Sequence, residues 1–127
     1  MTVMARKLGP KQARKLDAAR IFGDSLWDGS VDGTVLGCDA TILFVSAEPG
    51  EGPSWHLHPY DEIFIITEGC ASFTVGDEKI DATVGDVVMG PAHVPHKFHN
   101  SGSGTLRSID IHLSREWIQT DLDDPEA

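Results

Sequence analysis

The sequence predicts an all-β fold, a sandwich or barrel of antiparallel strands. From residue 35 onward, short runs rich in Val, Ile, Phe and Thr alternate with turns built from Gly, Pro and Asp. No long helical pattern lies between these runs, and strands at such close spacing are typical of sandwiches and barrels. With 127 residues, the chain is the size of one ordinary domain.

Eight strands are expected. They cover residues 35–46, 54–58, 62–67, 71–76, 79–83, 87–90, 95–99 and 105–113. Between them stand EPGEGP, PYD, EG, GDE, VGD, GPAHVP and NSGSG, which all have the composition of turns. The candidates for the barrel lining are Phe64, Ile66, Phe73, Met89 and Phe98.

The two ends of the chain are expected to lie outside the barrel, which would cover residues 25–114. Residues 1–24 form a short irregular or partly helical N-terminal arm, because Gly9-Pro10 interrupts any helix there. Residues 115–127 form an acidic C-terminal tail, expected to begin with a helical turn after Ser114 and then to fray.

The formal net charge of −10 is spread unevenly. Residues 1–20 hold six basic residues and one acid, whereas the other 107 residues hold four basic and nineteen acidic residues. An acidic body repels phosphate, so we expect no nucleic-acid partner. No apolar run could cross a membrane, and no secretory signal is recognisable at the start. A cytoplasmic location is therefore expected.

The strand predicted over 105–113 alternates sharply between two faces. Ile109 and Ile111 share one face with Arg107, and Asp110 and His112 lie on the other. If the polar face turned inward, Asp110 and His112 could orient a substrate or support a ligand imidazole. Because polar faces usually point to solvent, the outward arrangement is favoured.

A candidate metal site begins with two histidines. On a strand, His56 and His58 share a face, with Cα atoms about 6.5 Å apart, so both imidazoles can reach one ion. A proline-bearing turn follows, and it would place Glu62 beside them at the start of the next strand. His99 should face away from His96, because the two differ by an odd offset along a strand.

These residues belong to a pattern that resembles the cupin superfamily. Its first motif is matched by Gly50-x5-His56-x-His58-x3-Glu62-x6-Gly69. Its second is matched by Gly85-x5-Pro91, followed by His96 and Asn100, in the run GDVVMGPAHVPHKFHN. One position departs, since His93 stands where the family usually has glycine. The short separation between the motifs is similar to that of small single-domain bacterial cupins.

The resemblance implies a double-stranded β-helix (jelly-roll) cupin barrel with one divalent metal ion per chain. His56, His58, Glu62 and His96 occupy the family's four ligand positions. Three imidazoles and a carboxylate do not select among Fe, Mn, Zn, Ni, Co and Cu. Small cupins often pair through sheet faces, so a homodimer is expected.

Three functions are compatible with this resemblance. The first is a metal-dependent enzyme, of dioxygenase, decarboxylase, lyase or isomerase type, acting on a small oxygen-bearing molecule that chelates the metal. The second is a non-catalytic protein that binds or senses a small molecule through its metal. In the third, the ion only stabilises the fold. Open coordination, expected for this ligand set, favours the first two. Fold and motif do not fix the reaction, so the catalytic residues stay unassigned.

Overall fold

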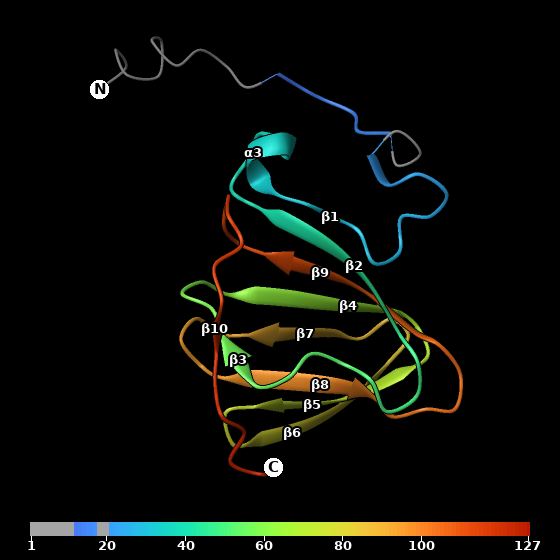
Figure 1. The fold of residues 1–127 in the computed structure, drawn as a ribbon, viewed down its shortest axis with the longest axis vertical. Helices are drawn as coiled ribbons and strands as arrows, with labels where there is room; N and C mark the ends of the chain where they lie inside the picture. The colour runs from blue at the N-terminus through green and yellow to red at the C-terminus, as the bar shows by residue number, and fades with distance from the viewer. Residues whose placement is uncertain (1–11, 18–20) are drawn as a thin grey trace.

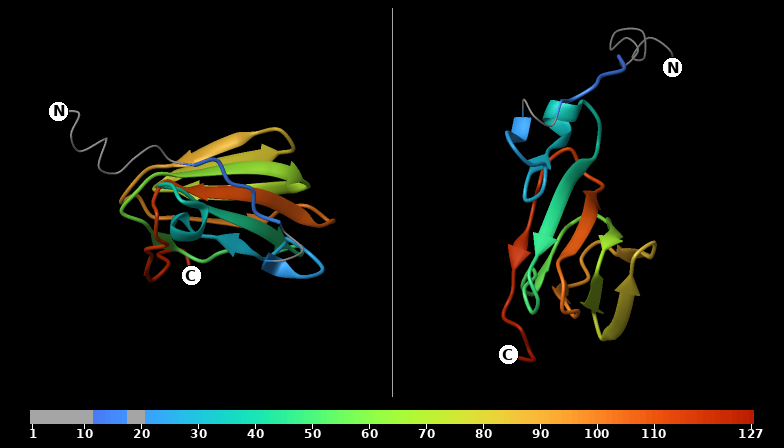
Figure 2. Two further views of the ribbon diagram at one scale, coloured as in Figure 1. Left: turned by 90° about the horizontal axis from the view of Figure 1, so that it is seen from above. Right: turned by 90° about the vertical axis from the view of Figure 1, so that its right-hand side faces the viewer.

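The computed structural model describes residues 12–17 and 21–127, and it contains two five-stranded antiparallel sheets that face each other (Figures 1 and 2). The elements are β1 (Ser30–Val31), α3 (Gly33–Leu36), β2 (Thr41–Ala47), β3 (His56–Leu57), β4 (Glu62–Glu68), β5 (Cys70–Val75), β6 (Glu78–Thr83), β7 (Val87–Gly90), β8 (His96–Asn100), β9 (Leu106–His112) and β10 (Thr120–Asp121). One sheet has the order β1-β2-β9-β4-β7 and the other β10-β3-β8-β5-β6. The predicted all-β jelly-roll fold is confirmed.

The apolar core lies between the sheets. Its aromatic centre joins β4, β5 and β8, because the Phe73 ring stacks on Phe98 at 4.7 Å between centroids and lies 5.0 Å from Phe64. These three residues and Ile66 are buried, as predicted. Met89 was wrong. It is 52% exposed, because β7 turns Val88 and Gly90 inward and Met89 to the outside.

The polar face of β9 points inward, so the favoured outward arrangement was wrong. Asp110 and His112 are 3% and 1% exposed, and Ser108 beside them is fully buried. At this end of the barrel the interior offers hydrogen-bond partners to polar groups. Outside, Ile109 and Ile111 lie opposite the β4 isoleucines in the register of the sheet. The alternation was therefore correct and the choice of face was not.

The strand predicted over 35–46 exists only in its second half, as β2. Before it, α3 forms because the Asp32 side chain accepts hydrogen bonds from the backbone N–H groups of Thr34 and Val35 at its N-terminus. The helix ends at Gly37, whose φ of 88° is the left-handed conformation that glycine adopts readily. Strand β1, two residues long, was not predicted.

Part of the expected N-terminal arm, residues 1–11 and 18–20, lies outside the described residues. Of the remainder, Arg14 donates a hydrogen bond from Nη1 to the Val35 carbonyl oxygen (3.0 Å). Leu16 and Phe22 help to line an apolar cavity of about 190 Å³ together with Ile42 and Phe44 of β2. This segment therefore packs against the outer side of the first sheet.

The C-terminal tail does not fray as predicted. Figure 1 shows it, in red, running from the end of β9 along the strand ends to the second sheet. There β10 pairs with β3, and beyond it Lys97 Nζ lies 2.6 Å from Asp124 Oδ2. An acidic tail finds basic partners on an otherwise acidic barrel, which explains why it is held in place. Within residues 12–17 and 21–127, no helix has the length and apolar character needed to span a membrane.

Candidate metal centre

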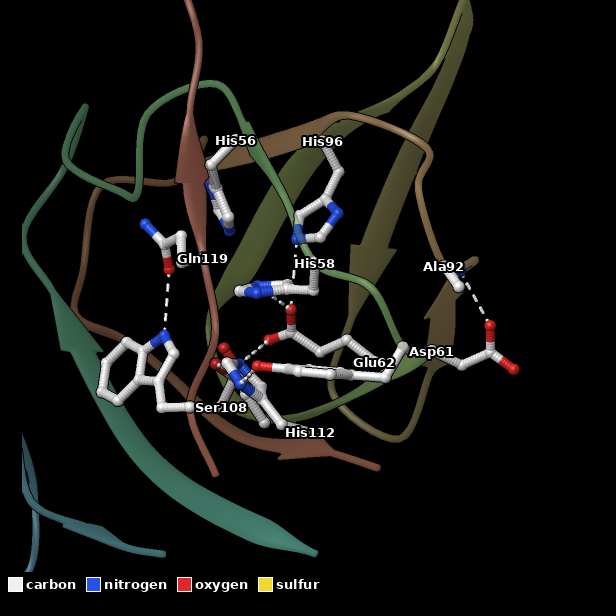
Figure 3. A network of polar contacts seen from close by, with 12 residues as sticks. His56, His58, Asp61, Glu62, Ala92, His96, Ser108, His112 and Gln119 are labelled. Carbon is white, nitrogen blue, oxygen red and sulfur yellow. Dashed lines mark hydrogen bonds and ion pairs between the residues drawn. The ribbon is translucent and has the colours of Figure 1, made fainter. Parts of the chain in front are cut away.

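The four residues predicted from the motifs meet at one end of the barrel interior. One possible ligand atom from each of His56, His58, Glu62 and His96 lies within 4.8 Å of all the others, a grouping that can hold a metal ion. All four are buried, with exposures between 1% and 5%. Figure 3 shows the three imidazoles around the Glu62 carboxylate.

Strand pairing brings these side chains together. In the second sheet, His56 of β3 lies opposite His96, the first residue of β8. In the first sheet, Glu62 begins β4 opposite His112, the last residue of β9. The loop before β3 lies so close to β8 that a Cβ on Gly52 would fall 1.9 Å from the Phe98 carbonyl oxygen. Glycine at this position lets the histidine strand join the sheet.

Backbone carbonyls fix the orientation of two of the imidazoles. His58 Nδ1 lies 2.7 Å from the Ile118 carbonyl oxygen, and His56 Nδ1 is hydrogen-bonded to the Ser54 carbonyl oxygen. A carbonyl only accepts, so each Nδ1 carries the proton and each Nε2 presents a lone pair. This is the second-sphere arrangement that metal-binding histidines usually have.

The chemistry of the donor atoms fits a divalent ion. His58 Nε2 is buried without a hydrogen-bond partner among the described residues, although it lies 3.0 Å from Glu62 Oε1. His96 Nε2 lies 3.1 Å from the same oxygen. The lone pair of His58 Nε2, facing a carboxylate oxygen at this distance, is repulsive unless a cation lies between them. Metal–ligand bonds near 2.1 Å place adjacent ligand atoms about 3 Å apart, which agrees with these separations.

The electrostatics of Glu62 and His56 match the forms in which these residues bind metals, whereas burial of His58 is outweighed by Glu62 and the Ile118 carbonyl, which raise its pKa. Burial opposes ionisation of Glu62, but the three histidines around it, His112 first and then His58 and His96, outweigh it and hold the pKa of the carboxyl below its ordinary value. Burial lowers the pKa of His56, with a smaller contribution from neighbouring histidines, which favours the neutral imidazole. The site therefore combines an ionised carboxylate with a neutral imidazole.

His112 joins the site as a fifth member. Its Nε2 lies 3.0 Å from Glu62 Oε2, the oxygen that faces away from His58. Its Nδ1 lies 2.8 Å from the Tyr60 hydroxyl, which accepts a hydrogen bond from the Ile118 backbone N–H (3.0 Å) and can donate either to Nδ1 or to the Ile118 carbonyl oxygen (3.0 Å). When Tyr60 donates to Nδ1, Nε2 carries the proton and donates to Glu62. His112 thus holds one carboxylate oxygen and leaves the other for the imidazoles.

A cavity of about 240 Å³ adjoins this cluster. Asp110 lines it together with His56 and Glu62, and its carboxyl group accepts a hydrogen bond from Ser108 Oγ (2.8 Å). Burial, followed by the negative charge of Glu62, raises the pKa of Asp110 well above its ordinary value. Trp117 and Gln119 line the cavity from the C-terminal segment, so the tail forms part of its wall.

Two other histidines lie apart from the cluster. His99 is exposed and, as predicted, faces away from His96. His93 is exposed as well, and its φ of 65° is left-handed, which explains why the family usually has glycine there. Its backbone N–H donates to the His58 carbonyl oxygen (2.7 Å). His93 therefore contributes a backbone hydrogen bond, and its side chain does not reach the site.

Two curated Streptomyces proteins are similar to this chain in sequence. An uncharacterized protein of Streptomyces coelicolor is 40% identical over 60 residues, which are 47% of this chain and 57% of that protein. Protein SchB of Streptomyces halstedii is 32% identical over 82 residues, 63% of this chain and 59% of SchB. The chain thus spans less than two thirds of the length of these relatives.

Solved structures share the fold. Oxalate decarboxylase of Bacillus subtilis, described in one structure by its Mn(II) centres, superimposes with a TM-score of 0.69 at 24% identity, over 73% of this chain and 27% of the enzyme. An uncharacterized Klebsiella pneumoniae protein with a double-stranded beta-helix domain gives 0.62 at 18% identity, over 68% and 76%. The model of the cupin domain matches residues 43–112, more than half of the sequence, and the chain therefore belongs to the cupin family.

Proposed function

We propose that this cupin binds one divalent metal ion through His56, His58, Glu62 and His96, and that it is an enzyme acting on a small oxygen-bearing molecule. The observation that carries the proposal is the buried His58 Nε2, which has no hydrogen-bond partner among the described residues and lies 3.0 Å from Glu62 Oε1. A bound ion would satisfy both atoms, and it would be enclosed by ligands already oriented by the surrounding chain.

The chain's own residues supply the rest of the proposed site. When bound, a divalent ion acts as a Lewis acid toward a chelating oxygen ligand. The cavity beside the cluster gives such a ligand room, and its two carboxyl groups have opposite pKa shifts. The histidines keep the pKa of Glu62 low, so it stays ionised, whereas burial raises the pKa of Asp110 and favours its protonated form, which can donate a hydrogen bond. Groups with such divergent pKa values are typical of acid–base chemistry.

The metal and the reaction type are proposed only as classes. The ligand set accepts Mn, Fe, Co, Ni, Cu and Zn. Manganese is the first ion to test, because a protein of the same fold is described by its Mn(II) centres. The same neighbour is a decarboxylase, which keeps lyase chemistry beside dioxygenase and isomerase chemistry as a candidate.

Metal analysis is the primary test. Protein purified without a histidine tag should contain close to one divalent ion per chain, and stripped protein should rebind one equivalent. A fully folded protein that remains metal-free in the presence of each of these ions would contradict the proposal.

Turnover is tested separately. Metal-loaded protein would be incubated with a panel of diketones, thiols and α-keto acids while oxygen uptake and product formation are followed. With iron, the protein would be loaded anaerobically and then exposed to oxygen. Product formed with one metal and absent in a Glu62→Gln variant would support an enzyme. Metal binding without any product would favour a non-catalytic protein that binds or senses its ligand.

We also propose that the protein forms a homodimer through the outer face of its first sheet. On this face the register aligns Met89, Ile63 and Ile111 in one row and Val87, Ile65 and Ile109 in the next. Met89 and Val87 are 52% and 64% exposed, so the apolar surface reaches solvent. Light scattering should give twice the chain mass, and Ile111→Glu should give the monomer. The cytoplasmic location remains a prediction.

A further inference from the structure

Asp110 is a buried acid that the proposed metal site does not use. Its side chain is 3% exposed, and the hydrogen bond from Ser108 is the one it receives from the described part of the chain. Its carboxyl group lines the 240 Å³ cavity together with Glu62. A polar group in this position is available to a molecule in the cavity.

The cavity presents no basic side chain to such a molecule. No lysine or arginine is among the described residues that line it. Arg107 is close in sequence, but strand alternation turns it to the outer face, where its guanidinium lies 4.9 Å from the Trp27 ring. A dicarboxylate would therefore meet the negative charge of Glu62 with a single metal ion as its cationic partner. Like charges enclosed together are costly at low dielectric.

Most of the residues that line the cavity are apolar. These apolar residues are Leu43, Val45, Pro53, Phe64, Phe98 and Trp117. The volume lies below the roughly 300–1,000 Å³ of sites for drug-sized ligands, so a compact ligand is favoured. A hydroxyl group both donates and accepts hydrogen bonds, so it satisfies the Asp110 carboxyl in either protonation state, whereas a carboxylate only accepts.

We infer that Asp110 determines ligand specificity, and that the cavity takes a compact, uncharged, mostly apolar molecule bearing hydroxyl groups and discriminates against dicarboxylates such as oxalate. The inference rests on the proposed function, because it places the ligand beside the metal-binding residues. It separates this chain from the oxalate decarboxylase whose fold it shares.

The test compares two ligands on zinc-loaded protein, because zinc has no redox chemistry that could consume them. Pyrogallol carries three adjacent hydroxyls on an apolar ring, and oxalate is a small dianion. Affinities would be measured anaerobically by calorimetry and by quenching of tryptophan fluorescence, with Trp117 in the cavity wall as reporter. Pyrogallol should bind at least tenfold more tightly than oxalate. Equal affinities, or tighter oxalate binding, would overturn the inference.

Variants then assign the preference to Asp110. In Asp110→Leu and Ser108→Ala, pyrogallol affinity should fall by about threefold to tenfold, the effect of one hydrogen bond, while oxalate affinity stays constant or rises. A general structural defect would weaken both ligands alike. Asp110→Asn keeps a hydrogen-bonding group of the same size and should retain pyrogallol affinity within threefold, so it serves if Asp110→Leu does not fold.

A matched control lies on the exposed side of the barrel. Ser72 Oγ donates to Asp81 Oδ1 at 2.8 Å, the same pair at the same distance outside the cavity, so Asp81→Leu should change neither affinity. Zinc content is measured first in every variant. If wild-type protein binds neither zinc nor any of the other candidate ions, the proposed function fails and the titrations are repeated without metal. Pyrogallol binding that depends on Asp110 would still support the inference, and binding independent of Asp110 in both forms would overturn it.

Discussion

The two ends of the barrel interior are built from the same strands but differ in chemistry. Along β4, Glu62 lies at one end and Ile66 toward the other, and both are buried. Along β9, His112 lies beside Glu62, whereas Leu106 lies in the apolar core. Each strand therefore passes from a polar end that carries the candidate site to an apolar end that carries most of the packing.

This difference separates stability from function. Burial of aromatic and aliphatic side chains stabilises the fold at about 25 cal/mol per Å² of apolar surface. The polar end gains little in this way, because each buried polar group first loses its hydration. Its charges and imidazoles are retained at that cost, which is typical of a site selected for chemistry.

The largest effect is expected from breaking the apolar end. Phe73→Ala should lower the free energy of unfolding by about 3–5 kcal/mol, because it opens a cavity where Phe73 stacks on Phe98. Chemical denaturation of metal-free protein would measure the loss. Met89→Ala is the control, since Met89 is half exposed and should cost about 0.5 kcal/mol or less. Equal losses in the two variants would contradict the assignment of the core.

A substitution at the polar end should reduce metal binding while the protein still folds. Glu62→Gln removes the charge that faces three imidazoles and should weaken metal affinity by more than about 100-fold, beyond the 10–100-fold typical of outer-shell changes. Metal content and the metal-induced shift in Tm would report it. His99→Ala, on the outer face of β8, should leave both unchanged. Full metal content in Glu62→Gln would remove this carboxylate from the proposed ligand set.

The same contrast explains what the sequence could predict. His56, His58, Glu62 and His96 follow two motifs with fixed spacing, so the candidate site, in which the structure groups these four residues, could be located before the fold was known. The lining residues Phe64, Ile66, Phe73 and Phe98 followed from strand alternation. Both predictions depend on local patterns that the chain repeats at the expected period.

What could not be predicted depends on contacts between distant segments. Alternation gave Asp110 and His112 a common face, but only pairing of β9 with β4 turns that face toward Glu62. Similarly, Ile118 reaches His58 through a backbone carbonyl, and any residue type supplies a carbonyl. The acidic composition of the tail suggested fraying and carried no signal for β10. Contacts between residues that are sixty positions apart, such as His58 and Ile118, cannot be predicted from the short-range hydrophobic periodicity of a strand.

Tyr60 tests how far the tail supports the polar end. Tyr60→Phe removes the hydroxyl that joins Ile118 to His112 Nδ1, so His112 no longer has a fixed proton position toward Glu62. Metal affinity should fall by about tenfold, the lower end of outer-shell effects, as measured by competition with a chromophoric chelator. Trp55→Phe, on the opposite face of the histidine segment, is the control. Unchanged affinity in Tyr60→Phe would show that His112 needs no such support.

The buried acid Asp110 should make the stability contributed by the polar end of the barrel depend on pH. Its pKa in the folded protein is raised, first by burial and then by Glu62, so the folded state holds a proton that the unfolded state releases near pH 4. Above that pH the unfolded state binds fewer protons, and stability contributed by this group falls as pH rises toward the folded-state pKa.

Asp110→Asn has no such loss. In metal-free protein, its stability relative to wild type should therefore increase as the pH rises from 4 to 7. Denaturant titrations at several pH values would measure this slope, and Asp81→Asn, which changes an exposed carboxylate bonded to Ser72, should give a flat difference. A flat or falling difference for Asp110→Asn would mean that the acid is ionised in the cavity, and the polar end would then hold two negative charges in place of one.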